Sequence, residues 1–383
     1  MATRYPRWAS VSAWKRRGRG DITFTGGAGG TGKITKTERD ALVWGSYIPS
    51  TANRGLLPGW TPNTLTPGPA PDINGDIFLT TAGATYTNTI FYGRVWFKAT
   101  GIVVDNSQFC GWHPSNYCDL DVNGNIIAGS QVAGDVAGCI ANAGATVYQA
   151  TITDSLIDPT PWGDPTVTTR PGGAAAVSQA DLIRYLAFSA GVRGGKVTMN
   201  RVEIRNVQDA FSFHQPRATT GDTAFTRINY GLHHQGHYYA GADFTMTPDG
   251  THTDGLQTQT GRDFQMYRTR VSGFHNAGAT LKQEVNADVL NRIEDFIIEE
   301  SIIEDDGSDG GALINHVYMS TRPDSWGGTT AIRNNLMVQR QAGGLVINRH
   351  TSFAAKYTNN RLVTLNANGS GWTDLGLAPI TNG

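Results

Sequence analysis

The sequence predicts an all-β protein, specifically a right-handed parallel β-helix in which short strands coil around one long core. Only 16% of the 383 residues are charged, whereas 47 are glycine; about 25% charged residues is usual in soluble domains. From about residue 76 onward, apolar and polar residues alternate with period 2, which is typical of half-buried strands. One alternating pattern also recurs with constant internal spacing, and such internal repetition indicates stacked structural units.

The recurring unit has two inward positions two residues apart, a two-residue corner, and two further inward positions. The one-residue change of phase at the corner indicates a bend between two strands. Asn and Asp are suited to such a bend because they tolerate the left-handed backbone conformation. The copies are Ile102–Phe109, Ala150–Ile157, Val197–Ile204, Phe264–Val271 and Phe296–Ile303, with weaker copies around 334–335 and 358–359.

A further strand is expected after each unit, following a turn with Gly, Asp or Asn. Its third and fifth positions are mostly apolar and are predicted to face inward, whereas its sixth position is polar. Three short strands per coil favour a solenoid. The alternative, a sandwich or propeller, would normally show hairpin signals. The copies of this strand are 209–215, 254–260, 277–283, 310–316 and 343–349, with polar sixth residues His214, Gln259, Lys282, Asn315 and Asn348.

Composition divides the chain into three regions. Residues 1–45 form a basic, glycine-rich arm, 46–75 a proline-rich connector or cap, and 76–383 the β-helix. The arm is expected either to anchor the protein to a partner or to be a disordered tail. It contains Gly27–Lys33, which matches a phosphate-binding loop, but Ile34 replaces the hydroxyl residue that would hold magnesium. We therefore expect a flexible linker there and no cofactor.

The net charge of −1 gives no overall field that would recruit nucleic acid or an anionic membrane. No segment approaches 18 consecutive apolar residues, so membrane insertion is not expected. The N-terminus has basic residues but lacks the apolar stretch of a secretory signal peptide. Cys110 and Cys118 are interpreted either as a disulfide across a loop or as buried thiols.

The sharpest local motif is Thr251–Gln257. In the alignment Asp254 opens a strand, and Gln257 and Gln259 point outward. Because parallel strands stack in register, outward positions of successive coils become neighbours. One predicted row contains His214, Gln259 and Lys282, and a second contains Ser212, Gln257 and Thr280.

Two polar rows on a flat sheet would form a shallow groove for an extended glycan, since amides and hydroxyls hydrogen-bond to sugars. The alternative is that these residues are ordinary solvent-facing positions of a solenoid. The candidate glycan-binding residues are His214, His252, Asp254, Gln257, Gln259 and Lys282.

Metal and catalytic sites receive weaker support from the sequence. The histidines at 233, 234, 237 and 252 are interpreted as loop residues usable for sugar contacts, and no metal site is assigned. The acidic residues between 294 and 309 are expected to form a solvated edge, with a Ca²⁺ site as the alternative. Asp254 with Asp209 or Glu284 would supply a glycosidase pair, and Lys282 or His214 a lyase base. No spacing requires either role, so no catalytic residue is assigned.

The chain resembles β-helix minor tail proteins of bacteriophages that infect actinobacteria. The resemblance covers about residues 46–370 and is carried by Ile48–Trp60, Thr64-Leu65, the coils from Gly75 and the motif His252-Thr-Asp-Gly-Leu-Gln257. It implies a protein exposed on the virion tail, assembled in the host cytoplasm without a signal peptide, that contacts host cell-envelope polysaccharide. It also implies a homotrimer. Residues 1–45 lie outside the resemblance, and their basic, glycine-rich composition suits an arm that docks to other tail proteins.

The same resemblance extends to pectate-lyase-like enzymes. It therefore leaves a polysaccharide depolymerase, either a lyase or a glycoside hydrolase, as the alternative to a non-catalytic adhesin.

Overall fold

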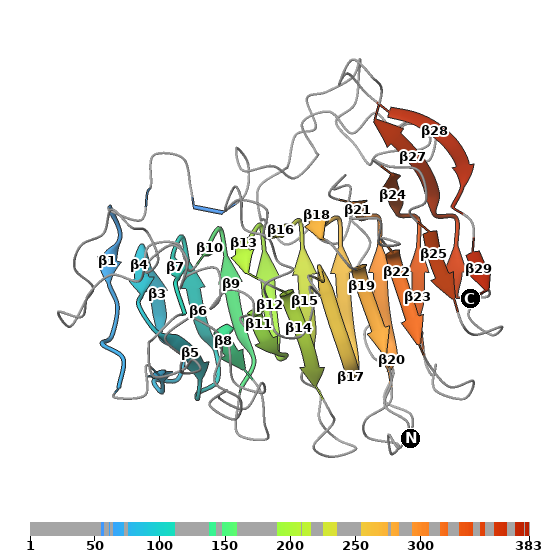
Figure 1. Ribbon diagram of the computed structural model, residues 1–383. Coiled ribbons are helices and arrows are strands. Elements are labelled where there is room, and N and C mark those ends of the chain that lie inside the picture. Colours follow the sequence, from blue (N-terminus) through green and yellow to red (C-terminus); the bar gives the residue numbers. More distant parts are fainter. Residues whose placement is uncertain are drawn as a thin grey trace, which may run out of the picture.

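A computed structural model describes most of the chain from the connector onward, and its strands lie side by side in one long stack (Figure 1). The described residues form strands and turns and no α-helix. The arm 1–45, His252, Cys118, His237 and Glu284 lie outside the described residues. The described residues are 55–56, 61, 64–72, 76–111, 138–142, 148–158, 190–207, 209–215, 225–235, 254–274, 277–282, 293–305, 315–320, 329–339, 345–348, 356–365, 372–378 and 380–382.

Three sheets, which we call A, B and C, run along the stack. Sheet A contains β1 (Thr66–Pro67), β4 (Thr89–Phe91), β7 (Gln108–Phe109), β10 (Leu156–Ile157), β13 (Glu203–Val207), β16 (Leu232–Gln235), β18 (Arg270–Phe274), β21 (Ile302–Asp305), β24 (Leu336–Gln339), β27 (Arg361–Leu365) and β28 (Trp372–Leu377).

Sheet B contains β2 (Asp76–Leu79), β5 (Arg94–Phe97), β8 (Gly138–Asn142), β11 (Ala190–Gly194), β14 (Asp209–Gln215), the first part of β17 (Leu256–Tyr267), β19 (Ala277–Lys282), β22 (Asn315–Ser320), β25 (Leu345–Asn348) and β29 (Ile380–Asn382).

Sheet C contains β3 (Thr85–Thr87), β6 (Ile102–Asp105), β9 (Ala150–Thr153), β12 (Val197–Asn200), β15 (Thr226–Asn229), the last part of β17, β20 (Glu294–Glu299), β23 (Ala331–Arg333) and β26 (Tyr357–Thr358). The chain visits the sheets in the order B, C, A and then starts the next coil. Pairings between the described strands are parallel, except that β28 folds back antiparallel on β27. The protein is therefore an all-β parallel solenoid.

The predicted inward residues form the core. Every inward position of the five full copies of the repeat is at most 1% exposed, including the polar ones such as Ser107 and Thr269. The widest side chains stack on each other along the solenoid: the ring centroids of Phe264 and Phe296 are 4.5 Å apart and their planes are nearly parallel. One continuous apolar column thus joins successive coils, as the alternation predicts.

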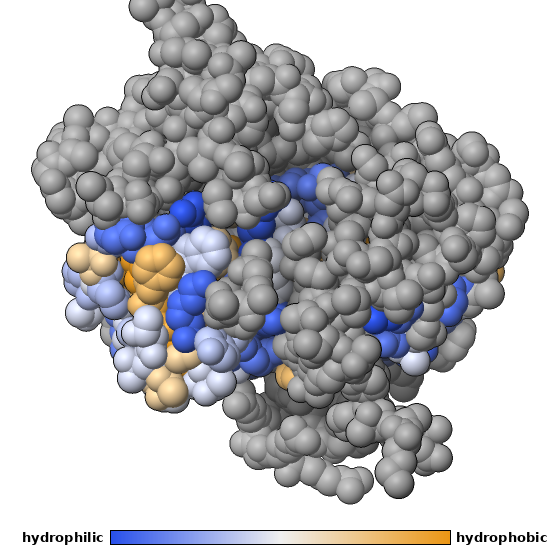
Figure 2. Space-filling model, turned by 90° about the horizontal axis from the view of Figure 1, so that it is seen from below, coloured by the Kyte–Doolittle hydropathy of each residue, from blue (hydrophilic) through white to orange (hydrophobic). Residues whose placement is uncertain are grey.

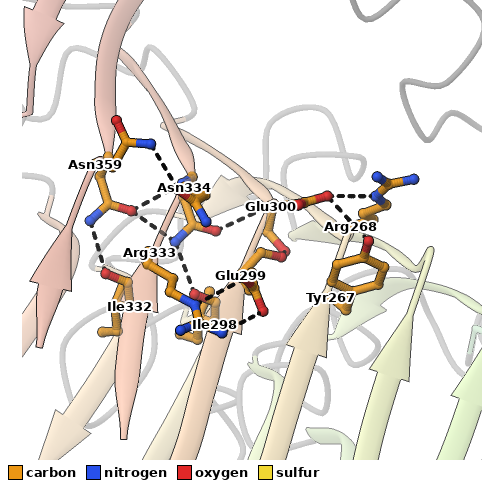
Figure 3. Close-up of polar contacts among 12 residues, drawn as sticks. Tyr267, Arg268, Ile298, Glu299, Glu300, Ile332, Arg333, Asn334 and Asn359 are labelled. Carbon is orange, nitrogen blue, oxygen red and sulfur yellow. Dashed lines mark hydrogen bonds and ion pairs between the residues drawn. The ribbon is translucent and has the colours of Figure 1, made fainter. Parts of the chain in front are cut away.

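The corners adopt the predicted bend. The second residue of each described corner has a left-handed φ between 43° and 60°, and these corner residues stack on one another. The backbone N–H of a corner donates to a carbonyl of the next coil, as from Arg268 to Glu299 at 3.1 Å. Side chains extend the stack: the amide of Asn359 donates to Asn334 at 2.8 Å (Figure 3). The corner residues are Asn88, Asn106, Asp154, Arg201, Tyr230, Arg268, Glu300, Asn334 and Asn359.

A polar ladder runs inside the core next to these corners. At several corners the hydroxyl or amide oxygen of the following residue accepts a backbone N–H from the coil before it, as Ser301 does from Thr269 at 3.1 Å and Asn335 from Ser301 at 2.8 Å. The corners at Arg201 and Tyr230 are instead followed by Val202 and Gly231. The hydroxyl of Ser301 also donates to the Glu299 carbonyl. These bonds satisfy backbone groups that the bend removes from the sheets, which explains why small polar residues are found at buried positions there.

The loop interpretation of the histidines at 233 and 234 is wrong, because both belong to strand β16. His233 is fully buried and lies in register between Ile204 and Val271. The segment from Thr226 to His233 is a further copy of the repeat, with its corner at Tyr230. The sequence pattern misses this copy because a histidine occupies the position where the other copies have an apolar residue.

The predicted alignment of residues 310–316 is also wrong. It places Asn315 at the outward sixth position, but β22 begins at Asn315 and sets this residue beside Ala277, the first position of β19. Val317 then lies beside Ala279 and Met319 beside Leu281. Residues 311–319 fit two period-2 patterns that differ by one residue in phase. Local alternation is consistent with both patterns, whereas the pairing with β19 is consistent with one of them.

The connector begins the solenoid on sheet A. Strand β1 pairs with β4, and Leu65 beside it is buried. Further back, the N–H of Gly55 donates to the carbonyl of Arg201 at 3.1 Å, and a side chain at Gly55 would lie 2.7 Å from a carboxyl oxygen of Glu203. The connector therefore lies against the outer face of sheet A at this point.

Glu203 itself is an acid in an unfavourable environment. It is 3% exposed, its carboxyl lies 3.3 Å from Arg205, and Arg205 also binds Asp158 at 2.6 Å. Burial is the main cause that raises the pKa of Glu203 to about 6, helped by Asp158 and opposed by Arg205.

We expect Glu203→Gln to increase stability at pH 8 by up to about 2 kcal/mol and to leave it unchanged at pH 4. The pKa of Glu203 is higher in the folded protein than in the unfolded chain. The protonated carboxyl therefore contributes to stability at pH values below the unfolded-state pKa, and this contribution is lost as the pH rises through about 6. Urea unfolding of both proteins at pH 4 and pH 8 measures it. An equal difference at the two pH values would contradict the assignment.

The cysteines that the structure describes are free thiols. Cys110 and Cys139 are both buried and unbridged, which confirms the buried-thiol interpretation for Cys110. Burial raises the pKa of both thiols, so they are held in the unreactive protonated form.

Among the described residues, no helix has the length and apolar character needed to cross a lipid bilayer.

Candidate ligand-binding surface

The outward positions of sheet B form a row along the solenoid. The register of the strands sets Arg193 beside Ser212, Ser212 beside Gln257, and Gln257 beside Thr280. The predicted neighbours Ser212, Gln257 and Thr280 are thus confirmed as neighbours. Gln257 is half-buried, whereas Ser212 and Thr280 are only 9% and 7% exposed. The Oγ1 atom of Thr280 is buried and has no hydrogen-bond partner in the part of the chain that is described.

The other predicted row is out of register. His214, Gln259 and Lys282 do lie in strands of sheet B, in β14, β17 and β19. A shift in pairing after Phe213 sets His214 opposite Thr260 instead of Gln259. The row is therefore wrong at His214; the pairing of Thr258 with Leu281 does not contradict Gln259 and Lys282 as neighbours, which stays a prediction.

Asp254 supports the backbone from a buried position. It is 1% exposed, and its Oδ1 atom accepts the N–H of Ala277 in the next coil at 3.0 Å. Its own N–H donates to Asp209 of the previous coil at 3.1 Å. The remaining carboxyl oxygen accepts the side-chain amide of Gln257 at 3.4 Å. Asp254 therefore joins three coils and positions Gln257.

The rest of the motif is explained by the same packing. A Cβ at Gly255 would lie 2.1 Å from Cγ1 of Val271 and 2.5 Å from the carbonyl oxygen of Gly278. Leu256 is fully buried in the core. In the sequence Asp254-Gly-Leu-Gln257, three residues thus serve coil stacking, and only Gln257 faces outward.

We expect Asp254→Ala to lower the free energy of unfolding by about 1–3 kcal/mol, because it leaves the buried N–H of Ala277 without an acceptor. Asp254→Asn keeps one acceptor oxygen and should lose less. Urea unfolding compares the three proteins. If both variants lost the same stability, the charge rather than the hydrogen bond would be responsible.

Four of the acidic residues expected at an exposed edge pair with arginines of neighbouring coils, whereas Asp306 and Asp309 lie outside the described residues. Glu300 accepts from Arg268 at 2.8 Å and from the Tyr267 hydroxyl at 3.2 Å, and Glu299 binds Arg333 at 2.9 Å (Figure 3). The planar guanidinium suits such pairs because it binds carboxylates in a fixed geometry. Further pairs join Arg262 with Glu294 and Arg270 with Glu304.

These ion pairs occupy carboxylates that a Ca²⁺ site would need. No group of three or more potential metal ligands gathers among the residues that are described.

An aromatic pair occupies the first coils of the same outward face. Phe78 of β2 and Trp96 of β5 are directly opposite each other in register, with ring centroids 6.3 Å apart and planes inclined by 27°. Phe78 is 46% exposed. Apolar side chains are visible among hydrophilic ones at this end of the molecule (Figure 2). We call Phe78 and Trp96 the aromatic pair.

Phe78 and Trp96 are not among the predicted site residues, although the alternation contains a signal for them. Phe78 stands between the buried residues Ile77 and Leu79, and Trp96 between Val95 and Phe97. Alternation therefore places a large aromatic side chain on the outside of two successive coils, where a solvent-facing residue would ordinarily be polar.

Comparisons with protein-family models, curated proteins and solved structures give no match to this chain.

Proposed function

We propose that the chain is a minor tail protein of a bacteriophage, exposed on the virion, which attaches to host cell-envelope glycan. In this proposal the solenoid is a right-handed, pectate-lyase-like parallel β-helix, and the outer face of sheet B contacts the glycan. The observation that carries the proposal is the in-register row of Arg193, Ser212, Gln257 and Thr280. Two members of the row, Arg193 and Gln257, are half-buried, so their polar groups can reach a polymer that lies along the sheet.

The burial of Asp254 favours an adhesin over a depolymerase. A catalytic carboxylate must reach its substrate, but both oxygens of Asp254 already accept hydrogen bonds from Ala277 and Gln257. Within Asp254–Gln257, the residue that is exposed enough to contact a glycan is the amide Gln257, which suits binding rather than proton transfer.

The arm 1–45 is proposed to dock to other tail proteins, and the assembled protein is proposed to be a homotrimer. The support for docking is composition, since residues 1–40 contain nine Lys and Arg against three Asp and Glu. A virion map at modest resolution tests location and copy number together.

Incubation with purified host-envelope polysaccharide tests the attachment. We expect saturable binding without new reducing ends or unsaturated sugars; release of such products would instead identify a depolymerase. Gln257→Ala combined with Gln259→Ala should lower adsorption to the host. Thr87→Ala, at an exposed position of sheet C, is the matched control. Absence of binding would contradict the proposed function.

A further inference from the structure

The exposed aromatic side chains gather at one end of the solenoid. In the described part of the chain, four large hydrophobic residues are strongly exposed, and two of them, Phe78 and Tyr148, belong to the first three coils. The N–H of Tyr148 donates to the carbonyl of Phe97, the residue that follows Trp96. The other two, Leu375 and Leu377, lie on β28 at the opposite end.

The Trp96 ring of the aromatic pair is held in place by charged neighbours. The indole N–H of Trp96 donates to Asp76 at 2.7 Å, and Arg94 binds both oxygens of the same carboxylate at 2.6 and 2.8 Å. Asp76 and Arg94 are 8% and 6% exposed, so this support is largely shielded from solvent. A Trp fixed in this way loses little conformational freedom when a ligand binds.

Cationic groups lie over the rings. The ammonium group of Lys98 lies 4.8 Å from the centre of the Trp96 ring and 6.0 Å from that of Phe78, and the guanidinium of Arg94 is 5.5 Å from Trp96. The site therefore combines the exposed apolar surface of Phe78 with cationic groups that lie over the rings.

We propose that the aromatic pair is a binding subsite for one sugar ring of a glycan. A sugar ring has an apolar face of C–H groups that packs on an aromatic ring, and hydroxyls around its edge that bond to charged or polar side chains. A protein partner is less suitable, since a stable interface buries about 800 Å² on each side, and the site offers two rings. A lipid tail would bring Lys98 and Arg94 into an apolar environment.

The position of the subsite connects it to the row of sheet B. Val95 pairs with Ile140, and Ala141 pairs with Arg193, so Trp96 begins the outward row that continues to Gln257. The choice of a glycan as ligand rests on the proposed function. The inference adds that ring stacking at the first coils contributes to affinity, in addition to the amide of Gln257.

Electrophoresis in gels that contain a soluble polysaccharide tests the subsite. The probes are dextran, mannan, arabinogalactan and alginate, which cover neutral and acidic sugars. We expect at least one of them to retard the full-length protein, and Phe78→Ala to weaken that binding about tenfold, as for loss of one aromatic contact. Trp96→Phe keeps a ring and should bind nearly as well as the wild type.

Leu377→Ala is the control, because it removes an exposed apolar side chain at the far end of the solenoid. Thermal unfolding by circular dichroism verifies that each variant is folded. If Phe78→Ala and the double variant Phe78→Ala with Trp96→Ala bind as well as the wild type, the subsite is refuted and glycan attachment stands. If the wild type is retarded by none of the four polysaccharides, the subsite is refuted, whereas host attachment is decided by the incubation with host-envelope polysaccharide.

Discussion

Gly255→Ala is expected to destabilise the solenoid by about 3–5 kcal/mol, because the added methyl group has no room between two coils. The new Cβ would lie 2.5 Å from the carbonyl oxygen of Gly278. A backbone carbonyl in a paired strand cannot rotate away as the end of a side chain can. The coils of β17 and β19 would have to separate, and Asp254 would lose its bond to Ala277.

Urea unfolding monitored by circular dichroism measures this effect. Gly83→Ala is the matched control: it places a methyl group where no atom lies within 4 Å, although its φ of 68° is left-handed. The control should lose only about 1 kcal/mol, the usual penalty of that conformation. Equal losses in the two variants would show that backbone conformation, rather than contact between coils, makes Gly255 necessary.

Phe264→Ala should lower the free energy of unfolding by about 3–5 kcal/mol, because it opens a cavity in the aromatic column of the core. Phe264 is 1% exposed and its ring contacts those of Phe211, Phe213 and Phe296, with centroid distances of 6.1, 4.8 and 4.5 Å. These partners come from the coils on both sides, so no single neighbour can move to fill the space.

The exposed Phe78→Ala provides the comparison for this variant. It removes the same ring from a side chain that is 46% exposed, so it should change stability by less than about 1 kcal/mol. Denaturant titration of both variants gives the difference. Equal stability of Phe264→Ala and Phe78→Ala would contradict the burial of Phe264 among the aromatic rings of the core.

Much of the fold follows from the sequence because the repeat encodes burial directly. Ile152 and Ile298 were placed in the core by their position before a corner, and both are fully buried. The corner residues Asn106 and Asp154 were placed by their tolerance of a left-handed backbone, and both adopt it. Each prediction depends on a few adjacent residues, so a local pattern is sufficient.

Prediction was less successful where residues far apart in the sequence determine the structure. The motif around Asp254 predicted an exposed ligand contact at this residue, but the structure buries its carboxylate against Ala277, 23 residues later. His233 was assigned to a loop although its neighbours Ile204 and Val271 place it in the core. In both cases the outcome depends on the adjacent coil, which the local sequence does not specify.

Local sequence is sufficient to specify the alternating strands, the left-handed corners and the continuous apolar core of each coil. Period-2 burial and turn preference each depend on a few adjacent residues. Which outward residues are neighbours, and which of them are exposed, depends on how the coils pack in the folded protein. Gln257 joined the row of Ser212 and Thr280 through strand register, and Phe78 and Trp96 came together as a fixed aromatic pair through pairing of β2 with β5. Exposure is a property of the assembled coils, since it depends on which parts of the chain cover each face.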